Sequence, residues 1–145
     1  GQYAHGNEPS HHIAYLYNYV GHQEKCAERV RQILTELYFD DHSGVCGNED
    51  AGQMSAWYVL SAIGLYQVDP AAGEFQFGSP IVHKATLNVG GGKNFTVIAH
   101  NNTMENIYIQ DVKLNGKPHV GTNITYDQIK AGGTLEFTMG ATPVK

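Results

Sequence analysis

The spacing of apolar residues along the chain changes from helical to strand-like near residue 70. Before that point they recur every three or four positions, and after it they alternate with polar residues. The first pattern predicts amphipathic helices and the second predicts half-buried strands. We therefore expect an α+β fold, with N-terminal helices over residues 1–72 followed by an antiparallel, β-sandwich-like segment over residues 73–145.

The first half predicts three helices. The first begins at Asn7–Pro9, where a capping residue precedes a proline suited to the first turn, and it ends at Gly21. The second covers residues 23–38 and carries a single apolar stripe. The third covers residues 51–65.

The third predicted helix is apolar almost all round, which is typical of a helix buried on most sides. Three helices provide too little cover for it, so we infer neighbours from elsewhere. In this chain the faces of Trp57, Tyr58 and Leu60 are therefore expected to be exposed or used in self-association.

The second half predicts short strands separated by turns rich in glycine and asparagine, at residues 81–89, 95–99, 107–114 and 135–139. The dipeptide Asn115-Gly116 is the strongest short-range signal for a two-residue hairpin turn. Short strands with such turns favour a sandwich.

Composition narrows the class of protein. The chain has 145 residues, of which 41% are hydrophobic, so it is long enough for one packed domain. A net charge of −5 and the lack of a basic run argue against nucleic-acid binding. No apolar run reaches the roughly 18 residues of a membrane span. Cys26 and Cys46 are compatible with a disulfide or with two free thiols.

The most informative segment runs from Cys46 to Tyr58, because it places Glu49 and Asp50 at the start of the apolar third helix. Acidic side chains beside an apolar helix lower the stability of the fold unless they are paired, hydrogen-bonded or used in function. An N-cap role for Asp50 accounts for one acid, but not for the polar side chains clustered around it. A carboxylate held ionised by a helix N-terminus also suits a general base.

A second polar cluster, residues 5–12, lies at the start of the first predicted helix, which suggests that both clusters form one site. Capping again accounts for part of it. Adjacent His11 and His12 point about 100° apart on a helix, and no HExxH spacing occurs, which disfavours zinc. Carboxylate and amide oxygens from Asn7, Glu8 and Glu49 suit calcium better.

These two clusters carry a family resemblance. Residues 6–12, GNEPSHH, followed by YLYNY at 15–19, resemble the C-terminal part of glycoside hydrolase family 92, the calcium-dependent exo-acting α-mannosidases. Residues 47–58, GNEDAGQMSAWY, resemble the most distinctive motif of that family, and FGSP at 77–80 also fits. The resemblance implies that residues 1–72 are the last helices of an (α/α)6 catalytic barrel in a much longer enzyme.

The resemblance also implies a mechanism that inverts the anomeric centre. Asp50 matches the general base, while Asn48 replaces an aspartate that some relatives carry. Calcium and the sugar would be bound by Asn7, Glu8 and Glu49.

The remaining implied sugar contacts are His11, His12 and Gln53, with Glu8 shared between metal and substrate. The partners would be mannose-containing glycans and the remainder of the same polypeptide, in the periplasm or outside the cell. The general acid of the family lies in a segment that these residues do not match, so the isolated chain is expected to be inactive.

Two other interpretations stay open from the sequence. The β half could be a carbohydrate-binding module supported by the helices. Alternatively, the chain could be a purely structural C-terminal domain whose polar clusters only cap helices.

Overall fold

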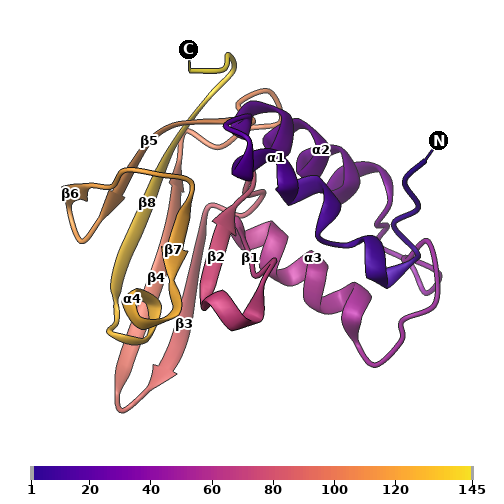
Figure 1. The fold of residues 1–145 in the computed structure, drawn as a ribbon, viewed down its shortest axis with the longest axis horizontal. Helices are drawn as coiled ribbons and strands as arrows, with labels where there is room; N and C mark the ends of the chain where they lie inside the picture. The colour runs from indigo at the N-terminus through magenta and orange to yellow at the C-terminus, as the bar shows by residue number, and fades with distance from the viewer. Residues whose placement is uncertain (1, 145) are drawn as a thin grey trace.

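The computed structural model describes residues 2–144. It places the first three α-helices on one side of the molecule and most strands on the other, with the short fourth helix among the strands (Figure 1). The helices are α1 (Leu16–Tyr19), α2 (Gln23–Glu36), α3 (Gln53–Ile63) and the short α4 (Tyr126–Lys130). Three single 3-10 turns accompany them at Glu8–Ser10, Ile13–Tyr15 and Pro70–Ala72. The predicted order of helices followed by strands is confirmed.

The first predicted helix is broken into two 3-10 turns and the one-turn α1. The carbonyl of His11 accepts a hydrogen bond from the Trp57 indole at 3.0 Å. The amide of Tyr15 therefore bonds to the carbonyl of His12 instead, in the tighter 3-10 pattern. Gly21 ends the segment in the left-handed region with φ of 78°, as predicted.

The two longer helices are each shorter than predicted. After α2 ends at Glu36, Tyr38 is extended and forms an isolated bridge with Val45. Helix α3 ends at Gly64, whose φ of 101° is unfavourable for residues with a side chain. This sharp end lets the chain enter strand β1 at once.

The strands form two sheets. The three-stranded sheet has the order β1-β2-β7, with β1 at Leu65–Tyr66, β2 at Glu74–Phe77 and β7 at Asn123–Thr125. The five-stranded sheet has the order β3-β4-β8-β5-β6, with β3 at Lys84–Gly90, β4 at Lys93–His100, β8 at Gly133–Gly140, β5 at Tyr108–Leu114 and β6 at Lys117–Pro118. Strand β1 lies before residue 73, so the first sheet takes one strand from the segment predicted as helical.

All neighbouring strands are antiparallel except β4 and β8, which run parallel. The reason is topological. Strands β4 and β5 run in opposite directions, and β8 lies between them, so it must be parallel to one of the two. The expected antiparallel sheet therefore holds with this single exception.

The strand predictions differ from the structure mainly at their ends. The run predicted from residue 81 starts only at Lys84, because the amides of Ile81 and Val82 bond to the carbonyl of Ala62 at the end of α3. The hairpin turn at Asn115-Gly116 is confirmed, with φ of 52° and 77° between β5 and β6.

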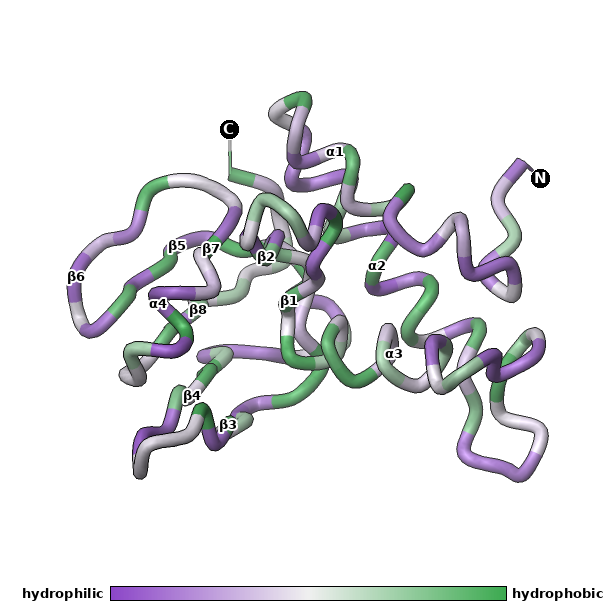
Figure 2. The backbone as a smooth tube through the Cα atoms, turned by 60° about the horizontal axis from the view of Figure 1, so that its bottom comes forward, coloured by the Kyte–Doolittle hydropathy of each residue, from purple (hydrophilic) through white to green (hydrophobic). Residues whose placement is uncertain are grey.

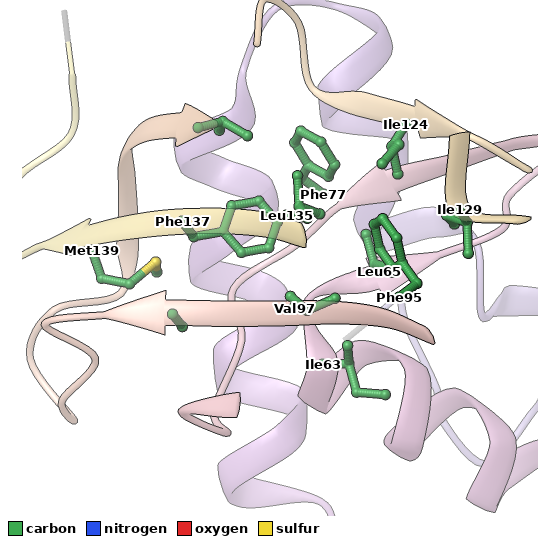
Figure 3. Packing of buried hydrophobic residues seen from close by; sticks show 12 residues of the cluster. Ile63, Leu65, Phe77, Phe95, Val97, Ile124, Ile129, Leu135, Phe137 and Met139 are labelled. Carbon is green, nitrogen blue, oxygen red and sulfur yellow. The ribbon is translucent and has the colours of Figure 1, made fainter. Parts of the chain in front are cut away.

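The two sheets enclose one hydrophobic core (Figure 3). Alternate residues of β8 face it, namely Leu135, Phe137 and Met139. Phe77 and Ile124 reach it from the other sheet. The predicted sandwich-like packing follows from this alternation, because successive side chains of a strand point to opposite faces.

A second core lies between α2 and α3. Hydrophobic and hydrophilic stretches alternate along α2 (Figure 2), and its buried face includes Val30 and Leu34. Trp57 of α3 is fully buried in this core, so the expectation that it would be exposed is wrong. The tryptophan is covered from within the chain, because Tyr15 and Tyr38 pack against its ring.

Arg31 links α2 to the β half. Its guanidinium is buried and donates to the Ser79 hydroxyl and to the carbonyl of Pro80, both just after β2. It also donates to the Asn102 side chain and the Thr103 carbonyl, after β4. Burial lowers the pKa of Arg31. Within residues 2–144 no carboxylate takes part, and the acceptors that hold this buried cation are all neutral.

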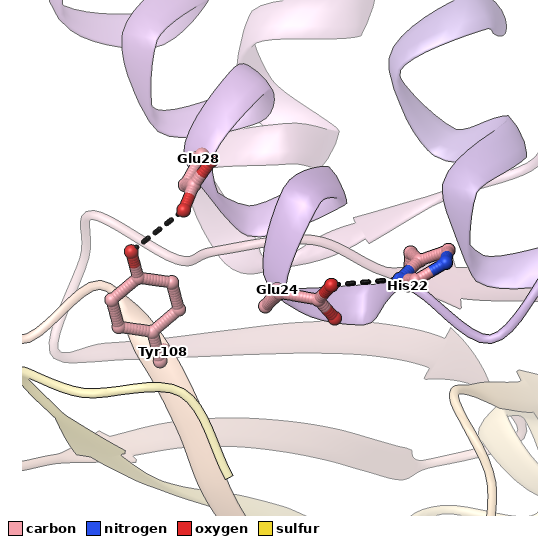
Figure 4. A network of polar contacts seen from close by, with 4 residues as sticks. All are labelled: His22, Glu24, Glu28 and Tyr108. Atoms are coloured by element: carbon pink, nitrogen blue, oxygen red, sulfur yellow. Dashed lines mark hydrogen bonds and ion pairs between the residues drawn. The ribbon is translucent and has the colours of Figure 1, made fainter. Parts of the chain in front are cut away.

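A polar contact joins the same two halves nearer the surface (Figure 4). Tyr108 of β5 donates to the Glu28 carboxylate at 2.8 Å, and this bond raises the pKa of the tyrosine. One turn earlier, His22 and Glu24 form a pair at 2.8 Å, which lowers the pKa of Glu24.

Two further features bear on the class of protein. No helix within residues 2–144 combines the length and apolar character needed to cross a bilayer. Cys26 and Cys46 are free thiols, so no disulfide joins them. Burial raises the pKa of the Cys26 thiol to about 12.

Candidate active site

The two polar clusters meet backbone to backbone. A Cβ atom added to Gly47 would lie 2.6 Å from the Cα atom of Gly6, and one added to Gly6 would lie 2.8 Å from the carbonyl oxygen of Cys46. Real Cβ atoms do not approach backbone atoms so closely, so both positions require glycine. This contact places the loop of Asn7 and Glu8 beside the loop of Glu49 and Asp50.

Glu49 caps the third helix. Its carboxylate accepts the Ser55 amide at 3.0 Å and the Ser55 hydroxyl at 2.8 Å. These two bonds lower the pKa of Glu49, the amide contributing most. The capping role that the sequence offered to Asp50 is therefore performed by its neighbour.

Asp50 lies in a turn of unusual backbone geometry. Asp50, Ala51 and Gly52 all have positive φ, at 23°, 57° and 82°. The first two carry side chains, for which such conformations cost of order 1–3 kcal/mol each and are concentrated at functional sites. The backbone carbonyl of Asp50 accepts the amide of Gln53 at 3.1 Å, which joins the turn to α3.

The Asp50 side chain is exposed and, within residues 2–144, accepts no hydrogen bond. The same holds for Asn48, two residues earlier. An exposed carboxylate without a protein donor can accept a hydrogen bond from water or a ligand. This arrangement is suited to a general base.

Glu8 has an unsatisfied atom. Its Oε1 is buried and has no hydrogen-bond partner among the described residues. Leaving a buried carboxylate oxygen unpaired is costly, so it points to a cation or a hydroxyl donor as the missing partner. Asn7 is exposed, and its amide nitrogen donates to the Ser10 hydroxyl at 3.3 Å, which leaves its carbonyl oxygen available.

These residues fit only part of a calcium site. Calcium takes 6–8 oxygen ligands. Across residues 2–144 no group of three histidine, cysteine, aspartate or glutamate side chains is arranged to hold a metal. Glu8 and Asn7 fit as two ligands, whereas Glu49 is engaged with Ser55 through both oxygens.

Behind the two loops lies a buried aromatic network that the sequence did not reveal. The Tyr3 hydroxyl lies 2.7 Å from Nδ1 of His5, and Nε2 of His5 lies 2.6 Å from the Tyr38 hydroxyl. Tyr38 in turn donates to the carbonyl of Met54 in α3. Burial, and secondly the nearby charge of His11, lower the pKa of His5 to about 4.

This shift gives a testable pH dependence. Unfolded His5 takes up a proton at its ordinary pKa of 6.5, whereas folded His5 does so only near 4. Its contribution to stability is therefore complete above pH 6.5 and is lost as the pH falls towards 4, by up to about 1.4 kcal/mol per pH unit. Thermal unfolding of the full-length protein between these pH values measures it.

The matched control for this prediction is His5→Gln, which keeps an amide for the tyrosines but cannot be protonated. We expect its stability to depend on pH less steeply than that of the wild type, by about one proton. Equal slopes for the two proteins would contradict the prediction.

The three predicted sugar contacts in this region differ in exposure. His12 and Gln53 are exposed, whereas His11 is only 1% exposed. His11 stacks on His5, with ring centroids 4.5 Å apart, and lies behind Gln53.

A cleft of about 830 Å³ is lined in part by Glu49 and Ser55. Aromatic and acidic side chains line it, including Phe39, Tyr58 and Asp40. Neither Asp50 nor Glu8 is among its lining residues.

Comparison with known proteins identifies the family. The sequence matches the glycosyl hydrolase family 92 catalytic domain over residues 1–141. The chain belongs to glycosyl hydrolase family 92. The resemblance seen in the residues around Glu8 and Asp50 is thereby confirmed.

Solved family 92 structures share this fold. An α-mannosidase from Bacteroides thetaiotaomicron is 40% identical, covers 99% of the chain and superimposes with a TM-score of 0.94. It has also been solved in complex with mannoimidazole. A second enzyme from the same organism, described as an inverting mannosidase, is 44% identical over 99% of the chain, with a TM-score of 0.91.

A fungal relative, described as an uncharacterized secreted glycosidase of Arthroderma benhamiae, is 33% identical over 138 residues, or 93% of the chain. The chain spans only 18% of that protein and 19% of each of the two bacterial enzymes. It therefore corresponds to about one fifth of a family 92 enzyme.

Proposed function

We propose that these residues belong to an inverting exo-α-mannosidase and supply its general base, Asp50. The observation that carries the proposal is the division of labour between the two adjacent acids. Glu49 caps α3, and within residues 2–144 the Asp50 side chain forms no hydrogen bond although its backbone is held in a strained turn. Family membership and the described activities of the two bacterial relatives also support it. Loss of α-mannoside hydrolysis in an Asp50→Asn variant of the full-length protein tests it.

In this mechanism a general acid protonates the leaving oxygen while Asp50 removes a proton from the attacking water. The two carboxyl groups of an inverting glycosidase stand about 6.5–9.5 Å apart, which admits that water between them and the sugar. Asn48 is exposed beside Asp50 and would bind the same water through its amide. The acid would come from another segment of the polypeptide, so the 145 residues alone would not hydrolyse substrate.

Substrate and metal would be held by the loop that contacts Gly47. The Oε1 atom of Glu8 and the amide oxygen of Asn7 would face calcium, and His12 and Gln53 would face the sugar. When bound, calcium would orient two mannose hydroxyls and favour distortion of the ring. The substrates would be mannose-containing glycans. The secreted fungal relative supports a location outside the cytoplasm.

Calcium binding by Glu8 has its own test. The Glu8→Gln variant of the full-length protein should bind calcium at least about tenfold more weakly, because the affinity of such sites depends on the number of charged ligands. Isothermal titration with calcium chloride measures the change. Glu49→Gln serves as the control and should keep the wild-type affinity, since that carboxylate bonds Ser55. Wild-type calcium affinity in Glu8→Gln would reject this assignment.

A further inference from the structure

His11 is enclosed between the two loops of the candidate site and all its polar atoms are engaged. Its Nε2 lies 2.9 Å from the carbonyl oxygen of His5, and its Nδ1 lies 3.3 Å from the amide nitrogen of Gln53. Its own carbonyl accepts the Trp57 indole. With 1% of its surface exposed, it has no face left for a substrate.

These contacts determine the tautomer of His11. A backbone carbonyl only accepts hydrogen bonds, so Nε2 must carry the hydrogen. In the neutral ring Nδ1 is then a lone pair and must receive a donor. Gln53 therefore turns its NH2 group, and not its carbonyl, towards His11.

The orientation of Gln53 follows from this. The Gln53 side chain also offsets part of the rise that burial causes in the pKa of Tyr66. With the side-chain nitrogen directed at His11, the side-chain oxygen of Gln53 is directed away from that ring. Gln53 is exposed and is the first residue of α3, and its backbone amide bonds to the carbonyl of Asp50. A fixed hydrogen-bond acceptor thus lies next to the turn that carries Asp50.

We propose that His11 is a positioning residue. Its Nδ1 lone pair binds the side-chain NH2 group of Gln53 and so holds the side-chain oxygen of Gln53 outwards, as an acceptor for a hydroxyl of the bound sugar. The inference rests on the proposed function, because the sugar is the ligand of that site. It assigns His11 a role without substrate contact. It also assigns the Gln53 side chain a definite role: it accepts a hydrogen bond from the substrate and does not donate one.

Two substitutions of His11 separate the proposed role from a structural one. In His11→Asn the side-chain oxygen takes the place of Nδ1, so it keeps an acceptor for Gln53 but loses the bond to the His5 carbonyl. In His11→Gln the amide nitrogen reaches the place of Nε2, so it keeps the bond to His5 but removes the acceptor. We expect His11→Gln to raise KM about three- to tenfold with little change in kcat, the worth of one hydrogen bond, and His11→Asn to stay closer to the wild type.

The measurement is steady-state hydrolysis of an aryl α-mannoside by the full-length enzyme, with thermal unfolding to check each variant. A purely structural His11 predicts the reverse order, with His11→Asn the more damaged, and that order would overturn the proposal. Gln53→Ala, at an exposed position, should raise KM as His11→Gln does. The double variant that combines His11→Gln with Gln53→Ala should have no higher a KM than Gln53→Ala alone. Additive effects, or a wild-type KM in Gln53→Ala, would also overturn it.

The proposed function can fail separately from this inference. If Asp50→Asn remains fully active, the assignment of the base is wrong whatever the His11 variants do. If Asp50→Asn is inactive and Gln53→Ala keeps the wild-type KM, only the role of His11 and Gln53 is rejected.

Discussion

Replacing Asp50 by asparagine in the full-length protein should lower kcat for α-mannoside hydrolysis by about 10²–10⁴-fold, the usual contribution of a general base. Asparagine has nearly the same shape but cannot take a proton from water. Because the carboxylate accepts no hydrogen bond within residues 2–144, its loss should leave folding intact. Steady-state kinetics together with thermal unfolding separate the two effects.

Glu49→Gln is the matched control, since it removes the adjacent carboxylate. It weakens the hydrogen bonds to Ser55 in the first turn of α3, so a fall in stability is expected with most of kcat retained. If Glu49→Gln lost activity while Asp50→Asn kept it, the base would have been assigned to the wrong residue.

Replacing Arg31 by methionine should destabilise this part of the protein by roughly 3–5 kcal/mol, as expected when a buried hydrogen-bonded charge is removed and its acceptors stay behind. The carbonyls of Pro80 and Thr103 would each lose their guanidinium donor. Methionine fills a similar volume, so the loss of stability would come from the missing hydrogen bonds more than from altered packing.

Hydrogen exchange in the full-length protein measures this locally, because it reports the opening free energy of α2 and of the loops after β2 and β4. Arg29→Met, on the exposed face of the same helix, is the control and should change stability by less than about 0.5 kcal/mol. Equal protection in the two variants would show that Arg31 does not join the halves.

The sequence predicted best where a local rule was sufficient. The alternation of β8, the stripe of α2 and the Asn115-Gly116 turn each depend on neighbouring residues, and each is present in the structure. Helix α4 was missed, although Thr125 and Gln128 form a capping box whose spacing is readable in the sequence.

The errors have a common cause in contacts between distant residues. The break in the first predicted helix comes from the Trp57 indole, 46 positions from the His11 carbonyl that it binds. The same tryptophan was expected to be exposed because the helical pattern cannot show that aromatic rings from other segments cover it.

The candidate site divides in the same way. The sequence by itself determined the family, through the residues around Glu8 and Asp50, and it determined the order of helices and strands, since both depend on residue identity and short-range spacing. Only the tertiary structure decided which acid caps α3, which glycines let the loops touch and which histidine stands behind Gln53. Those outcomes depend on backbone turns and on hydrogen bonds between segments far apart in the chain, which no periodicity records.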